Sequence, residues 1–111
     1  MEEIVFAVQG SAPSPYEVRF VRRDGGNLTA SCSCPAGAVG QYCKHRFNLM
    51  AGSTEGVVSQ NLEQVPLVCE WLAGTDVEAA MDRLAKAELQ VADAKRLVSK
   101  AKKDLAAAMR D

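Results

Sequence analysis

The feature that most constrains this chain is a cluster of metal-ligating residue types in its first half. Three of the four cysteines and the only histidine fall within fourteen residues, in the order Cys32, Cys34, Cys43 and His45. Thiolate sulfur and imidazole nitrogen are the ligands that zinc prefers, and three cysteines with one histidine fill a closed tetrahedral site. A closed site leaves no position for a catalytic water. We therefore predict one structural Zn²⁺ per chain.

The spacing of these residues predicts how the chain brings them together. Cys32 and Cys34 are two residues apart, so their thiols leave the same face of an extended strand. The loop that follows is long enough to turn back toward the strand. Cys43 and His45 are expected at the entry to a helix that begins near Lys44, where unpaired backbone N–H groups favour a thiolate.

Other interpretations of the cysteines fit less well. Cysteines scattered through a core would rarely fall into a CxC pair followed by CxH. A secreted domain with two disulfides is disfavoured because cysteines two residues apart cannot readily bridge each other. Met1-Glu2-Glu3 is also a poor start for a secretory signal. Disulfide exchange at the CxC pair would require metal-free thiols. We expect a reducing compartment, the cytoplasm or, in a eukaryote, the nucleus.

The motif Cys32-x-Cys34-x8-Cys43-x-His45 resembles the SWIM-type zinc finger, whose pattern is CxC, a variable gap and CxH. The resemblance covers roughly residues 1–52. It implies a ββα zinc module of a family found in chromatin-remodelling-type ATPases, Mutator-like transposases, ubiquitin ligases and recombination-associated proteins. Members are described as modules that bind nucleic acid or protein. The finger itself implies no enzymatic activity.

Alternating apolar residues predict three strands before the helix, at residues 3–9, 16–23 and 28–34. The Asp24-Gly25-Gly26-Asn27 run between the last two is typical of a hairpin turn. The fold class we predict is α+β: a small ββα zinc module, with a three-stranded antiparallel sheet and a helix, followed by a long C-terminal coiled-coil helix. We predict a SWIM-like module over residues 1–53, a linker with a short helix over 54–74, and an oligomerisation helix over 75–111.

The middle region gives weaker signals. Residues 57–65 fit a short helix or irregular chain equally well. Pro66 suits the first turn of a helix over 67–73, which Gly74 would end. Cys69 lies in an apolar run without a CxC partner, and we interpret it as a small buried hydrophobe in preference to a fifth ligand. Trp71 is expected in core packing more than as an exposed anchor.

The last third predicts one long helix. Thr75 and Glu78 form a capping box, and neither Gly nor Pro occurs after Gly74. A heptad pattern follows in which a valine or leucine alternates with an alanine at 3-4 spacing, typical of a coiled-coil seam. The seam comprises Val77, Ala80, Leu84, Ala87, Val91, Ala94, Val98, Ala101, Leu105 and Ala108.

This seam resembles the close-packed antiparallel coiled coils called alacoils, because alanine at every second position lets two helices approach closely. An alanine-rich helix can show such periodicity by chance. Here, however, the larger residues share one position and no charge enters the seam. We expect a homo-oligomer, with a dimer favoured. The flanking residues leave parallel and antiparallel pairing open.

The charge balance does not single out a nucleic-acid binder, since the net charge is −1. We therefore predict a non-enzymatic binding and assembly module whose finger contacts a protein partner and whose coiled coil makes it multivalent. The alternative is a DNA-binding finger that contacts phosphates through basic residues near the zinc. Those residues are Arg19, Arg22, Arg23, Lys44 and Arg46. No phosphate loop, nucleophile elbow or paired acidic site is present, and no apolar run reaches the length of a membrane span.

Overall fold

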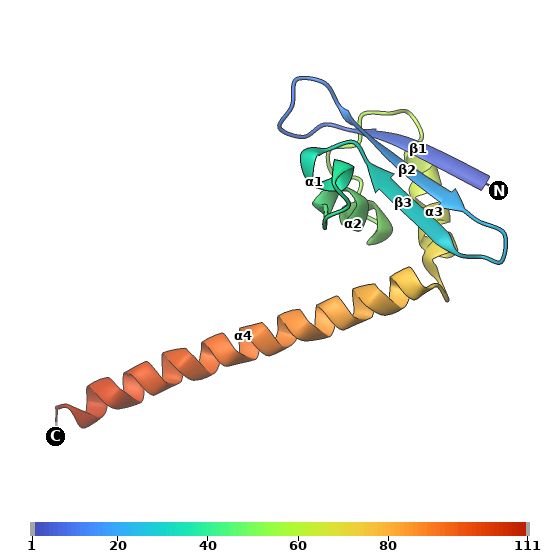
Figure 1. Ribbon diagram of the computed structural model, residues 1–111. Coiled ribbons are helices and arrows are strands. Elements are labelled where there is room, and N and C mark those ends of the chain that lie inside the picture. Colours follow the sequence, from blue (N-terminus) through green and yellow to red (C-terminus); the bar gives the residue numbers. More distant parts are fainter. Residues whose placement is uncertain (1, 111) are drawn as a thin grey trace. The chain divides into compact units, whose positions relative to one another are not determined.

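The computed structural model describes residues 2–110 (Figure 1). It forms two compact units, Met1–Glu78 and Ala79–Asp111, which are described separately. The elements are β1 (Glu2–Val8), β2 (Tyr16–Arg22), β3 (Leu28–Cys32), α1 (Pro35–Ala38), α2 (Lys44–Met50), the 3-10 turn η1 (Leu62–Gln64), α3 (Val65–Leu72) and α4 (Asp76–Ala108). The predicted α+β class, with a three-stranded antiparallel sheet followed by helices, is confirmed.

The sheet is an antiparallel meander in the order β1-β2-β3. Its second hairpin closes as the sequence predicts: the Arg23 N–H donates to the Asn27 carbonyl at 2.8 Å. Gly25 and Gly26 have φ angles of 89° and 85°, which a side chain would disfavour. The turn therefore fixes the register in which Val18 faces Cys32.

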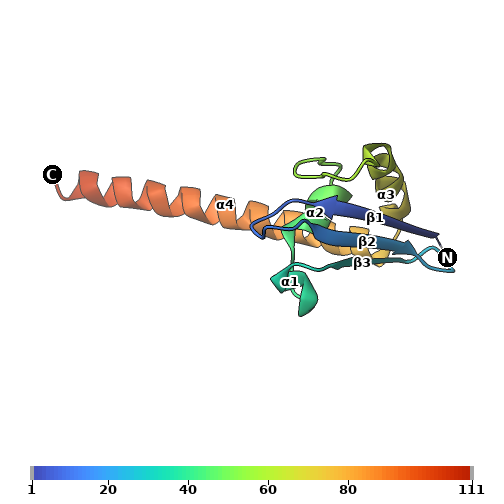
Figure 2. The same cartoon turned by 90° about the horizontal axis from the view of Figure 1, so that it is seen from above.

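Alternate strand residues build the core on one face of the sheet. Phe6 and Phe20 are fully buried and their rings meet edge to face at 6.0 Å. Helices α2 and α3 lie on this side of the sheet (Figure 2) and add Leu49, Val65, Val68, Trp71 and Leu72 to the core. Trp71 is thus a packing residue, as predicted. The other face carries the half-buried or exposed residues Glu3, Val5, Ala7, Glu17, Arg19, Val21, Thr29 and Ser31.

The chain after α2 returns to the free edge of β1. The Gln9 N–H donates to the Gly56 carbonyl and the Val58 N–H to the Ala7 carbonyl, both at 2.8 Å. The Asn61 side-chain amide donates to the Val5 carbonyl at 2.9 Å. The first compact unit consequently reaches Glu78, beyond residue 53, where the sequence suggested a boundary. Residues 54–74 include the expected short helix, α3, with Pro66 in its first turn.

The start of α4 is fixed by Thr75 and Glu78. The Glu78 N–H donates to Thr75 Oγ1 at 3.2 Å, and the Glu78 carboxylate accepts from the Gly74 N–H at 3.1 Å. The Thr75 hydroxyl also donates to the Leu72 carbonyl at 2.6 Å, which joins the end of α3 to the start of α4. The 33-residue helix is about 50 Å long. No helix within residues 2–110 is long and apolar enough to cross a membrane.

Candidate metal centre

The four predicted ligands come from three short elements of the first unit. Cys32 ends β3, and Cys34 is the N-cap residue of α1. Cys43 is the N-cap residue of α2, and His45 lies in the first turn of that helix. Two details differ from the sequence-based expectation: β3 ends at Cys32 and not at Cys34, and the segment expected to form a loop after Cys34 contains α1.

The ligand atoms gather closely enough for one metal ion. All four lie within 4.8 Å of one another. The Sγ atoms of Cys34 and Cys43 are 3.4 Å apart. His45 Nδ1 lies 3.5 Å from Cys43 Sγ and 3.8 Å from Cys32 Sγ. Tetrahedral zinc, with bonds of about 2.3 Å to sulfur and about 2.0 Å to nitrogen, requires ligand separations of about 3.8 Å and about 3.6 Å. The cluster therefore fits a zinc ion bound through His45 Nδ1.

The backbone around the site stabilises negative charge on the sulfurs. The Gly37 N–H donates to Cys34 Sγ at 3.3 Å and the Cys34 N–H to Cys32 Sγ at 3.5 Å. Burial opposes ionisation of Cys43, but hydrogen bonds from the Arg46 backbone, the neighbouring thiols and His45 outweigh it and lower its pKa to about 6. Such N–H groups at a helix start are typical of thiolate ligands.

The pKa of the Cys32 thiol is shifted in the opposite direction. Burial raises this pKa to about 12, while the hydrogen bond from the Cys34 backbone opposes the shift. Adjacent buried thiols do not ionise together, because each thiolate repels the next. A divalent cation removes that repulsion, so metal binding here displaces protons from the thiols. The donor set and its charge balance thus both fit a thiolate-binding cation.

Two glycines and a tyrosine that the sequence did not single out support the site. A Cβ on Gly37 would lie 2.5 Å from the Cys32 carbonyl oxygen, so α1 packs directly on the end of β3. A Cβ on Gly10 would lie 3.1 Å from His45 Nε2, on the other side of the imidazole from the sulfurs. The Tyr16 ring covers His45 at a centroid distance of 5.1 Å. Only CxC and CxH spacing marked the site in the sequence, and no local signal pointed to these neighbours.

The five basic residues of the DNA-binding alternative have different surroundings. Arg19 is ion-paired with Glu3 and Glu17, which raises its pKa, first through the hydrogen bond to Glu17 and then through the charges. Arg22 Nη1 lies 3.9 Å from Glu2 Oε1, within ion-pair distance.

The remaining three basic residues lie near the hairpin turn and α2. Arg46 donates to the backbone carbonyls of Ala30, at 3.2 Å, and Gln41. Arg23 and Lys44 are exposed. The structure therefore does not gather the five into one patch of free cations.

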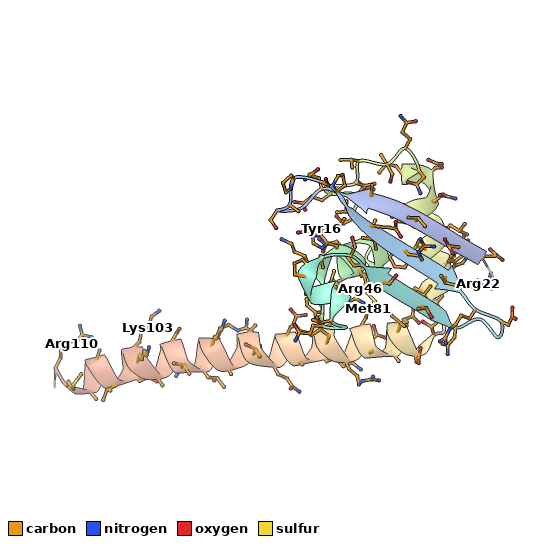
Figure 3. All side chains as sticks on the ribbon, turned by 45° about the horizontal axis from the view of Figure 1, so that its top comes forward. Tyr16, Arg22, Arg46, Met81, Lys103 and Arg110 are labelled. Carbon is orange, nitrogen blue, oxygen red and sulfur yellow. The ribbon has the colours of Figure 1, made fainter. Side chains whose placement is uncertain are left out.

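The other residues singled out in the sequence are not part of the four-residue ligand cluster. Cys69 is half-buried on α3, and its thiol donates to the Met50 carbonyl at 3.6 Å, so it is not a fifth ligand. All ten residues of the predicted seam fall within α4. Side chains project from α4 along its length, including the labelled Lys103 (Figure 3).

Comparison with known families decides which zinc module this is. Residues 6–46 match the family model of the SWIM zinc finger. This segment is a SWIM zinc finger. The match begins within β1 and ends just after His45, so it covers the end of β1, the whole of β2 and β3, and all four ligands of the finger. Searches of curated proteins and of solved structures give no significant match to the chain.

Proposed function

We propose that this protein is a non-enzymatic assembly module in which one structural Zn²⁺ per chain holds the SWIM finger and α4 joins two copies. The finger would offer a protein-binding surface, and dimerisation would make that surface bivalent. The four-ligand cluster supports the first part. With all four zinc positions taken by protein, the ion would stabilise the fold and activate no water.

The exposure of helix α4 supports the proposal that it joins two copies. None of its 33 residues, all of which the structure describes, is buried. Val91 and Val98 are each 54% exposed and Leu105 is 60% exposed. An apolar stripe of this length on a helix without a partner in its own unit is typical of a coiled-coil interface. A second helix would remove these side chains from water.

A protein partner for the finger is favoured over DNA by the pairing of the basic residues. Arg19 and Arg22 lie beside carboxylates, and Arg46 is held by backbone carbonyls. A phosphate-binding surface would need these cations free, because affinity for DNA rests on cations that replace its counterions. The face of the sheet opposite the core, with Val5 and Val21 among polar residues, would then be the surface that contacts a protein.

Sedimentation of the zinc-loaded protein tests the assembly role. We expect a dimer for the wild type and a monomer for the Leu84→Asp, Val91→Asp double variant, because two buried carboxylates per helix would disrupt the interface. The matched control replaces the outward-facing Leu89, which is 65% exposed, by aspartate and should remain dimeric. An unchanged mass for the double variant would exclude α4 as the interface.

Fluorescence anisotropy with labelled single- and double-stranded DNA separates the two partner classes. Weak binding at low salt that disappears at physiological salt agrees with a protein-binding module, because non-specific DNA contacts weaken steeply with salt. Binding that persists at physiological salt would instead support the nucleic-acid function. Arg23 and Lys44 would then be the first residues to replace.

A further inference from the structure

The apolar stripe of α4 has an unusual order of side-chain sizes. Valine or leucine occupies one seam position at 77, 84, 91, 98 and 105, and alanine occupies the other at 80, 87, 94, 101 and 108. In a parallel dimer each residue would face its own copy, so layers of large pairs would alternate with layers of alanine pairs. Helices at constant separation would then leave voids at the alanine layers, which proteins avoid.

An antiparallel pair with complete overlap of the two helices removes this mismatch. In that register two seam residues face each other when their numbers add up to 185, so every larger residue faces an alanine, and flanking residues meet when their numbers add up to 183 or 187. Val77 then faces Ala108, Leu84 faces Ala101 and Val91 faces Ala94. Every layer contains one large and one small side chain, and the two helices can remain equally close throughout.

The flanking charges alone leave the orientation open, but in the register that the seam requires they are complementary. At the flanking positions of this register, Glu88 lies opposite Lys95 and Arg83 opposite Asp104. The two-fold symmetry repeats both attractive pairs, which makes four in the dimer, and no like charges meet. Asp104 already has a partner within its helix, Lys100 at 3.1 Å, so the Glu88–Lys95 pair carries the charge argument.

Each neighbouring register brings like charges together. A shift of one heptad in one direction pairs Glu88 with Lys102 but brings Lys95 against Lys95 of the second copy. A shift in the other direction brings Glu88 against its own copy. A parallel pair keeps only the attraction between Arg83 and Glu88.

We propose that the protein forms an antiparallel dimer through α4, with residues 77–108 of the two copies in full overlap. This inference rests on the proposed assembly function and defines its partner as a second copy of this chain. Each finger would then be attached near the start of α4, at opposite ends of a coiled coil about 50 Å long. Two protein targets bound at once would have to lie at a comparable distance.

A charge-swap experiment on the full-length, zinc-loaded protein tests the orientation. Glu88→Lys and Lys95→Glu are made singly and together, and the dimer dissociation constant is measured by sedimentation equilibrium. Neither position has a charged residue three or four positions away, so the swap alters no ion pair within the helix. We expect each single variant to weaken the dimer by roughly tenfold, because two pairs change from attraction to repulsion. The double variant should return to within about twofold of wild type.

The control swaps Asp82→Lys and Lys103→Asp, which are exposed and lie outside the seam and its flanks, and should leave the constant unchanged. In a parallel dimer Lys95→Glu would have little effect, since it faces Gln90. In a parallel dimer the double variant would dimerise as weakly as Glu88→Lys, because the lysine introduced at position 88 would face Arg83. If the protein is a dimer but the variants behave in this way, the antiparallel orientation is wrong and the assembly function still stands. A wild-type monomer at all concentrations overturns the assembly function as well.

Discussion

The close approach of α1 to β3 gives the sharpest prediction about the finger. Gly37 lies within α1 and has no positive φ, so alanine suits its backbone. In open surroundings Gly37→Ala would stabilise the protein by about 0.5–1 kcal/mol, because glycine loses more conformational freedom on folding. Here the added Cβ would lie 2.5 Å from the Cys32 carbonyl oxygen and 2.8 Å from Cys32 Cβ. Both distances are shorter than a van der Waals contact, and the Cys32 carbonyl oxygen is a backbone atom that cannot move away like the end of a side chain.

Relief of that clash has to separate α1 from the end of β3. Cys32 and Cys34 lie on the two sides of this contact, so the movement would spread two zinc ligands. Overpacking of this kind costs about 1–3 kcal/mol. Because zinc binding and folding of such a module are coupled, a net loss of about 2 kcal/mol would lower zinc affinity roughly thirtyfold.

Competition with a chromophoric chelator measures this change, and thermal unfolding of the zinc-loaded protein measures the stability. Gly40→Ala is the matched control, since a Cβ there meets nothing within 4 Å although φ is 76°. It should cost only the strain of the left-handed conformation, about 1 kcal/mol. A Gly37→Ala protein that binds zinc as tightly as wild type, or melts at a higher temperature, would refute the reasoning.

Further predictions concern the ligands and the separate folding of the two units. Cys43→Ser and His45→Ala should each release the metal and unfold Met1–Glu78, because the small core depends on the zinc; metal analysis and melting curves check this, and retained zinc with an unchanged melt would contradict it. Removal of zinc by EDTA should abolish the tertiary signal of the finger but preserve most helical circular dichroism, because α4 contributes no ligand. Loss of the whole helical signal on chelation would show that the two units do not fold separately.

The ligands of the site could be predicted because their chemistry is local. The spacing of Cys32, Cys34, Cys43 and His45 and the turn at Gly25-Gly26 determine which groups can converge, and the structure brings them together. The helix α1 was missed because it has only four residues, one of them glycine. Its closeness to β3 depends on a glycine without unusual φ, for which the sequence gives no sign.

The surroundings of the arginines and the region after α2 could not be predicted, because they depend on distant residues. Arg19 meets Glu3 only through the pairing of β1 with β2. The edge of β1 is bonded by side chains such as Asn61, 56 residues away in the sequence, which no periodicity reveals. Local patterns predict secondary-structure elements and metal ligands. Contacts between distant residues can be predicted only when the pairing register of the strands is known.

The position of Arg46 affects whether the sheet can pair with strands of other molecules. In an antiparallel pair, alternate residues of an edge strand direct their backbone groups away from the sheet. Arg23–Asn27 and Glu17–Ser33 bond across β2 and β3, so Ala30 directs its carbonyl outward, and the Arg46 guanidinium occupies that carbonyl. The α1 helix lies over Cys32 next along the strand, while residues 56–61 cover the opposite edge at β1. A charged side chain and the chain itself thus block addition of further strands, and the small sheet is protected at both edges from polymerising with its neighbours.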